Sequence, residues 1–206
     1  MLTRQISRLA GEAVASAARS LSPEGWVVVL DIDETALDNS AYQLERAAYG
    51  LPFAQPSWQA WVRRAQAGLV PGVREFVQRV RQLGGRIAWI TDREADDKDA
   101  DLTTATKINL GNVGLWGERD LLCMRHGSRD TKAVRRRDLT MGGGSCSWPD
   151  KPVPVLVFVG DQAGDFPGNG ESLPDAGSDD AFGHRFFLLP NPMYGGWTTA
   201  VTRQAP

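Results

Sequence analysis

Two carboxylates, Asp31 and Asp33, follow directly after the apolar run Trp26–Leu30. A short run of β-branched and aliphatic residues predicts a buried strand of a parallel sheet, and open α/β folds bind ligands at the carboxyl ends of such strands. Two acids this close repel each other unless a cation or a shared proton relieves the repulsion. The alternative is a solvated acidic turn that caps the next helix, with Asp or Thr35 as the N-cap. We favour the chemical interpretation.

Further polar side chains follow the later apolar runs. Thr91 ends the second run, Lys132 lies just beyond the third, and Asp161 and Asp165 follow the fourth. Because the carboxyl ends of parallel strands meet at one edge of a sheet, we expect these residues to share a rim with the acidic pair. Each alone has a structural explanation, as a helix N-cap, a solvated charge or a turn. Their order and their common placement at strand ends indicate a functional site.

This set of side chains suits phosphoryl transfer. Strand-end carboxylates form a hard oxygen site that Mg²⁺ prefers, while Thr91 and Lys132 can hold phosphate oxygens through a hydrogen bond and a point charge. Asp31 is then placed to attack phosphorus and form an aspartyl-phosphate. Asp33 can protonate the leaving oxygen and later activate water. The sequence therefore predicts Mg²⁺-dependent hydrolysis of a small-molecule phosphate monoester.

The elements that position these residues alternate between strand and helix. We predict strands at 26–31, 86–93, 120–124, 153–161 and 186–190, and helices at 2–20, 35–50, 57–67, 73–83, 99–110 and 131–139. Such alternation implies right-handed crossovers and a parallel sheet. The predicted class is α/β, a three-layer Rossmann-like parallel sheet with a small helical cap.

Length and composition favour one domain. The chain has 206 residues, of which 42% are hydrophobic and 23% are charged, a balance that suits a single globular unit. We predict one phosphatase domain over residues 1–206. Its cap insertion spans about 36–70, with Ser57 as the N-cap of the second cap helix, and a segment at about 186–206 closes the pocket.

Charge, hydropathy and cysteine content exclude other classes. The net charge of −2 lacks the basic excess that binding to a nucleic acid polymer or an anionic membrane needs. No stretch reaches the length of a transmembrane segment, and residues 2–20 form an amphipathic pattern unlike a signal peptide. Cys123 and Cys146 allow at most one internal disulfide, and whether they are bridged stays open.

The motifs together resemble a known family. The run Asp31–Thr35 resembles the first motif of the haloacid dehalogenase superfamily, Thr91 its second, Lys132 its third, and Gly160–Asp165 its fourth. The match extends to bacterial class C acid phosphatases, the lipoprotein-e-type 5′-nucleotidases, over about residues 25–197. Its additional segments are Leu30–Ser40, Ser57–Trp61, Val70–Gly72, Ile90–Arg93, Gly160–Phe166 and Leu189–Trp197.

The resemblance implies a role for each site residue. Asp31 is the nucleophile and a metal ligand, Asp33 is the acid and base with its backbone carbonyl on Mg²⁺, and Asp161 is the remaining carboxylate ligand. Asp165 lies behind the ligands, near Lys132.

The resemblance also implies how substrate is held. Thr91 and Lys132 hold the phosphate, and Trp58 and Tyr194 sandwich the base or another aromatic leaving group. By periodicity alone, Trp58 would simply pack in the core. Asp92 departs from the Asn that the family more often has after the Thr91 position.

Family resemblance also implies an extracytoplasmic protein, periplasmic or secreted. No signal peptide is visible in this chain, so a cytoplasmic location stays open. A homodimer is one option for the oligomeric state, which the sequence does not specify.

Three alternatives compete with this interpretation. The stretch Arg125–Arg129 spells the signature of histidine acid phosphatases, with His126 as nucleophile and His184 as a second histidine, but it follows the third strand instead of the first. A non-enzymatic receiver domain would carry its phosphorylated Asp on a later strand. A nucleotide-binding module without catalysis would use only the aromatic pair and leave the carboxylates unexplained.

Overall fold

The computed structural model describes residues 1–95, 101–149, 152–173 and 175–195. The helices are α1 (Leu2–Ala17), α2 (Ser40–Ala48), α3 (Gln55–Arg64), α4 (Val73–Gln82), α5 (Asp101–Asn112) and α6 (Lys132–Met141), with short 3₁₀ turns η1 (Ala18–Ser20), η2 (Ala163–Asp165) and η3 (Asp179–Ala181). The strands are β1 (Val27–Leu30), β2 (Leu37–Asp38), β3 (Gly68–Leu69), β4 (Arg86–Glu94), β5 (Leu121–Arg125), β6 (Val155–Gly160) and β7 (Phe186–Leu188). The predicted start of one helix at Asp99 lies outside the described residues.

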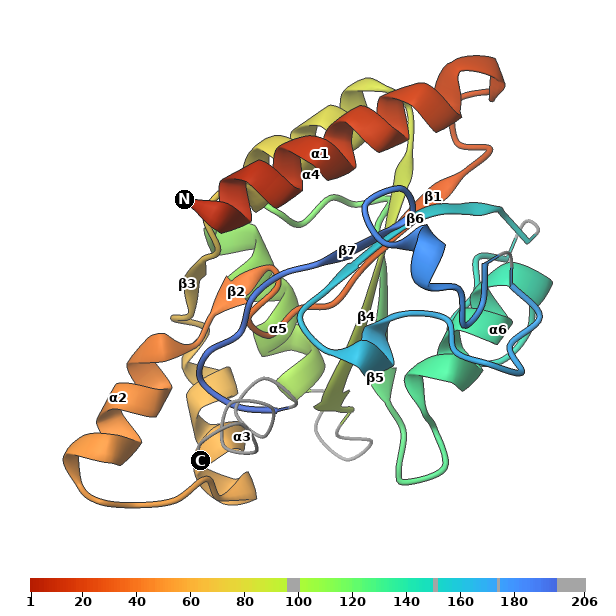
Figure 1. The fold of residues 1–206 in the computed structure, drawn as a ribbon. Helices are drawn as coiled ribbons and strands as arrows, with labels where there is room; N and C mark the ends of the chain where they lie inside the picture. The colour runs from red at the N-terminus through yellow and green to blue at the C-terminus, as the bar shows by residue number, and fades with distance from the viewer. Residues whose placement is uncertain (96–100, 150–151, 174, 196–206) are drawn as a thin grey trace, which may run out of the picture.

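Five of the described strands form one parallel sheet in the order β5-β4-β1-β6-β7. Strand β1 lies at its centre, and α1 and α4 run side by side over one face while α6 covers the other (Figure 1). This arrangement confirms the predicted α/β class with a parallel sheet between helical layers. No helix in the described part of the chain combines the length and hydrophobicity that a bilayer span requires.

Alternation along β1 separates two cores. Val28 and Leu30 pack with the residues of α1 and α4, whereas Val27 and Val29 pack with Leu139 of α6. Both faces of the strand are therefore buried, which explains why its sequence is a continuous apolar run.

Small residues bring α1 close to the rest of the molecule. The buried positions of α1 are Ser7, Ala10, Gly11 and Val14. At the N-cap of α4, Gly72 has a φ of 100°, and a Cβ there would lie 2.8 Å from the Cα of Arg4. Only glycine fits both that dihedral angle and that approach.

The segment between β1 and α4 holds α2, α3 and a two-stranded antiparallel pair, β2 with β3. Figure 1 shows α2 and α3 beyond one end of the sheet, away from α1 and α4. Tyr42 packs edge-on against Trp58, with ring centroids 5.2 Å apart. The division into one domain with a cap and a closing segment stays a prediction.

Two local predictions in this segment are wrong. We expected a helix from Thr35, but α2 begins at Ser40. The carbonyl of Ile32 accepts hydrogen bonds from the amides of Ala36 and Leu37, each at 2.8 Å, and the turn that results lets Leu37 pair with β3. Pairing with a strand distant in sequence overrides the local helical pattern.

The second error concerns the start of α3. The helix begins at Gln55 with Ala54 as N-cap, and the hydroxyl of Ser57 donates a hydrogen bond to the Ala54 carbonyl at 2.8 Å instead of capping the helix. Pro56 sits in the first turn, where its missing N–H has no helical partner to lose.

A disulfide joins Cys123 of β5 to Cys146 in the loop after α6, closing a sequence separation of 23. We predict that Cys146→Ser lowers the free energy of unfolding by about 3 kcal/mol, because the bridge limits the entropy of the unfolded chain. Urea denaturation with and without reductant measures the effect. Reduced wild type should match the variant, and the variant should not respond to reductant. An oxidised wild type no more stable than the variant would contradict the prediction.

Candidate active site

The carboxyl edge of the sheet brings together residues from four elements. Asp31 follows β1, Thr91 lies in β4, Lys132 begins α6 and Asp161 follows β6. The ammonium of Lys132 donates to Asp31 Oδ1 and to Asp165 Oδ1, each at 2.5 Å. Thr131 accepts a hydrogen bond from the amide of Val134 at 3.3 Å and so caps the helix that presents Lys132.

Three buried carboxylates form a compact cluster next to this lysine. Oxygen atoms of Asp31, Asp161 and Asp165 all lie within 4.8 Å of one another. Burial raises the pKa of Asp31 well above its usual range, Lys132 opposes this, and the charges of the neighbouring carboxylates add to it. Burial alone would lower the pKa of Lys132, but Asp31 and Asp165 reverse that effect and raise it. A cluster with more buried carboxylates than ammonium groups fits a hard divalent cation.

Asp165 occupies a supporting position in this cluster. Its Oδ2 accepts hydrogen bonds from the amides of Asp161 at 3.0 Å and Gln162 at 2.8 Å, while its Oδ1 accepts from Lys132. The 3₁₀ turn η2 that follows β6 places the carboxylate there. Both of its oxygens therefore accept hydrogen bonds from protein donors. That Asp165 supports the metal ligands without binding the metal stays a prediction.

The carboxylate of Asp33 is paired with Arg93. The guanidinium of Arg93 approaches Asp33 Oδ1 at 2.7 Å and Oδ2 at 3.2 Å, and Asn39 donates to Oδ1 at 3.0 Å. Arg93 also donates to Thr106 at 3.1 Å and lies 5.8 Å from the ring centre of Trp58. With its carboxylate engaged in this way, a metal role for Asp33 would use the backbone carbonyl, as the resemblance implies.

Sequence reasoning missed Arg93. A signal was available, because Arg93 and Thr91 are two residues apart on one strand and therefore share a face. Thr91 is fully buried and Arg93 is 3% exposed. A buried arginine needs a carboxylate partner, and Asp33 is that partner.

Three side chains in the described part of the structure donate hydrogen bonds to the carboxylate of Asp161. Thr35 donates to its Oδ1 at 3.2 Å, and Gln162 and Asn191 donate to its Oδ2 at 2.8 Å each. Burial raises the pKa of Asp161, and the bonds from Asn191 and Gln162 oppose that shift. The role of Asn191, which comes from the chain after β7, was not anticipated from the sequence.

The two predicted stacking residues, Trp58 and Tyr194, lie near residues of the proposed site. Trp58 is half-buried on α3 and lies over Arg93. The hydroxyl of Tyr194 donates to Glu34 Oε2. Burial, together with the charge of Asp33, raises the pKa of Glu34 to about 7. Stacking on a substrate ring stays a prediction for both aromatic residues, and Trp197 of the same motif lies outside the described residues.

Thr91 and the unexpected Asp92 are tied to a second buried arginine. Arg135 of α6 is fully buried and donates to the carbonyl of Thr91 and to Cys123 O at 3.2 Å. It also pairs with Asp92 at 2.7 Å and with Asp130 at 3.1 Å. The carboxylate at position 92 therefore gives Arg135 an anionic partner at the end of β4.

The two histidines of the histidine-phosphatase alternative do not belong to the carboxylate cluster, although Arg125 and Ser128 of its motif line the same cavity as Lys132 and Asp165. The side chains of His126 and His184 are exposed. Arg125 pairs with Glu94 at 2.6 Å, and the amide of His126 donates to Asp130 at 2.7 Å. The Arg-His-Gly sequence is thus held by one local hydrogen bond and by a pair with Glu94 of β4.

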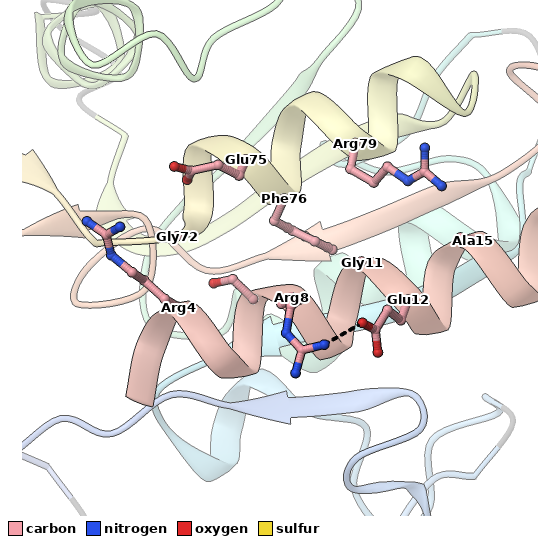
Figure 2. Close-up of a pocket in the computed structure, with 10 residues that line it drawn as sticks. Arg4, Arg8, Gly11, Glu12, Ala15, Gly72, Glu75, Phe76 and Arg79 are labelled. Atoms are coloured by element: carbon pink, nitrogen blue, oxygen red, sulfur yellow. Dashed lines mark hydrogen bonds and ion pairs between the residues drawn. The ribbon is translucent and has the colours of Figure 1, made fainter. Parts of the chain in front are cut away.

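Two hollows of the surface differ in their relation to this site. A cavity of about 590 Å³ is lined by Lys132, Asp165, Arg136 and neighbouring residues, which include Arg125 of β5 and Ser128 of the loop after it. Another, of about 470 Å³, lies between α1 and α4, where Arg8 pairs with Glu12 (Figure 2). Only the first touches predicted site residues.

The fold of this chain is similar to that of solved class C acid phosphatases. The protein is similar to the class C acid phosphatase from Bacillus anthracis, with a TM-score of 0.76 and 26% identity over 99% of this chain and 82% of that one. A second structure of that enzyme, with tungstate bound, gives a TM-score of 0.74 and 27% identity at the same coverage.

The family follows from the sequence match. The model of the HAD superfamily, subfamily IIIB (acid phosphatase), matches residues 1–197, so the chain belongs to this family and the predicted resemblance is confirmed. Another relative, the stem 31 kDa glycoprotein of Glycine max, is 26% identical over 176 residues. That alignment covers 82% of this chain, which spans 59% of the length of the soybean protein.

One glycine supports the geometry of the cluster directly. A Cβ at Gly160 would lie 2.2 Å from the Cβ of Asp165. We predict that Gly160→Ala lowers the free energy of unfolding by about 1–3 kcal/mol, because the new methyl group must displace Asp165 or the strand end. Urea denaturation measures the change. Gly164→Ala is the matched control, since a Cβ there has no neighbour within 4 Å, and equal stability of both variants would contradict the prediction.

Proposed function

We propose that this protein is a Mg²⁺-dependent acid phosphatase that hydrolyses phosphate monoesters through an aspartyl-phosphate on Asp31. One observation carries the proposal: Lys132 bridges Asp31 and Asp165 at 2.5 Å beside a cluster of three buried carboxylates. A cation facing a buried carboxylate suits the binding of a phosphate dianion that this carboxylate then attacks. Family membership supports the same reaction class.

In the proposed first step, Asp31 attacks phosphorus while the bond to the leaving oxygen breaks. Asp33 donates its proton to that leaving oxygen, and Thr91 and Lys132 hold the non-bridging oxygens. In the second step, water attacks the aspartyl-phosphate, its proton passes to Asp33, and the Asp31 carboxylate is regenerated. Bound by Asp31, Asp161 and the Asp33 backbone carbonyl, Mg²⁺ would offset the repulsion between carboxylates and phosphate.

The proposed substrates are nucleoside monophosphates or aryl phosphates. Trp58 lies near Arg93, the partner of Asp33, and Tyr194 contacts Glu34, so a ring on the leaving oxygen could stack on them. The tungstate bound to the Bacillus anthracis enzyme is an oxyanion, as phosphate is, and this supports an anion site in the present chain.

We place the protein outside the cytoplasm. The bridge between Cys123 and Cys146 supports this location, because disulfides persist in oxidising compartments. The proposed partner is a small-molecule phosphomonoester.

Exchange of the nucleophile tests the reaction. Asp31→Asn should lower kcat for p-nitrophenyl phosphate at least ~1000-fold, because an amide cannot form the aspartyl-phosphate. His126→Ala should retain most of the activity, since its side chain is exposed. Chelation with EDTA should abolish phosphate release, and added Mg²⁺ should restore it. The reverse pattern of the two variants would favour the histidine mechanism instead.

The pH profile tests the acid. We predict that kcat/KM is highest at acidic pH and falls toward alkaline pH, because the group that protonates the leaving oxygen must begin each turnover protonated. Phosphate release from p-nitrophenyl phosphate between pH 4 and pH 9 measures the profile, at a fixed ionic strength with saturating Mg²⁺. A flat profile up to alkaline pH would contradict a carboxylic acid as proton donor.

A further inference from the structure

The side chain of Asn191 uses both ends of its amide. The residue is fully buried. Its Nδ2 donates to Asp161 Oδ2 at 2.8 Å, and its Oδ1 accepts from the amides of Met193 at 2.9 Å and Tyr194 at 3.4 Å. One planar group thus contacts a carboxylate of the cluster on one side and the backbone that carries Tyr194 on the other.

The local sequence explains how this geometry arises. The amide of Leu189 donates to the carbonyl of Gly160 at 2.8 Å, which brings the chain alongside the end of β6 just before Asn191. Pro192 has no N–H, so the next donors available to the Asn191 oxygen are the amides at 193 and 194. Asparagine closes such turns through its own side chain, and here the turn directs Tyr194 back toward the site.

Contacts of Tyr194 and Gly195 hold this turn against the residues around the carboxylate cluster. The Tyr194 hydroxyl donates to Glu34, which follows Asp33 in the turn after β1. At Gly195, whose φ is 80°, a Cβ would lie 2.4 Å from Oε1 of Gln162, another donor to Asp161. The segment after β7 therefore packs directly on the residues that orient Asp161.

We propose that Asn191 is a positioning residue that couples the metal-binding carboxylate Asp161 to the aromatic ring of Tyr194, so that one side chain sets both metal affinity and preference for aromatic leaving groups. The inference rests on the proposed function for the roles of Asp161 and Tyr194. It adds that the two roles are linked. A residue that merely stabilised the fold would not change both properties together.

Four variants separate the contact of Asn191 with Asp161 from its contact with the backbone that carries Tyr194. Thr35→Val is nearly isosteric and removes a donor to Asp161, whereas Tyr194→Ala removes the ring and its hydrogen bond to Glu34 but no donor to Asp161. Asn191→Asp keeps the oxygen that the amides of Met193 and Tyr194 donate to, but replaces the donor to Asp161 with a carboxylate oxygen. Asn191→Ala removes both contacts. Thermal unfolding identifies any variant that does not fold, and Asn191→Asp, with almost unchanged volume, carries the test if Asn191→Ala fails.

Two measurements are made on each protein. Calorimetry of Mg²⁺ binding to the metal-free chain gives a dissociation constant independent of turnover. The ratio of KM values for p-nitrophenyl phosphate and glycerol 2-phosphate reports the contribution of the ring. Wild-type phosphate release is measured first, so that absence of phosphatase activity, a failure of the proposed function, is seen separately from failure of the link.

The expected pattern has three parts. Thr35→Val should weaken Mg²⁺ binding roughly tenfold or more, and Asn191→Asp, which exchanges a donor for a charge, should change it by a similar factor, both with little change in the KM ratio. Tyr194→Ala should shift the KM ratio by roughly fivefold or more against the aromatic substrate, with unchanged Mg²⁺ binding. Asn191→Ala should show both effects. An Asn191→Ala protein that changes only one of the two properties, or an Asn191→Asp protein with wild-type Mg²⁺ binding, would overturn the proposal.

Discussion

The charge balance of buried carboxylates at the end of β1 and β6 is the constraint on which the rest of the structure depends. Carboxylate oxygens of Asp31, Asp161 and Asp165 lie within 4.8 Å of one another, and the three residues are buried. In the described part of the chain, Lys132 is the cation that pairs with two of them. Ionised groups so close in a low-dielectric interior repel strongly, so such a site is stable only when cations or donors surround it, and the surrounding elements supply both.

Buried arginines extend this arrangement outward from the site. Arg93 fixes the carboxylate of Asp33, and Arg135 joins the end of β4 to the start of α6. Arg136, 3% exposed, pairs with Glu171 at 2.7 Å and donates to the carbonyl of Gly164 at 2.9 Å, which holds the turn that carries Asp165. Removing one member of such a pair leaves a buried charge without compensation, and this makes each pair costly to disrupt.

Much of this could be predicted from the residues in order. Apolar runs ending in Asp or Thr indicated the parallel sheet and the edge at which its polar residues meet, because a strand buried on both faces has little other use for a carboxylate at its end. The start of α2 and the cap of α3 were not predicted correctly. At both places a partner distant in sequence, or a proline in the first turn, decided the backbone against the local pattern.

The sequence by itself determined the fold class and the identity of the residues at the strand ends, because hydrophobic periodicity and motif order are local properties. Only the tertiary structure decided which donors hold each carboxylate. Arg93 for Asp33, Asn191 for Asp161 and Arg135 for Asp92 are separated in sequence by 60, 30 and 43 residues. Such contacts depend on how elements pack against each other, and the chain order of single residues does not encode their distances or directions.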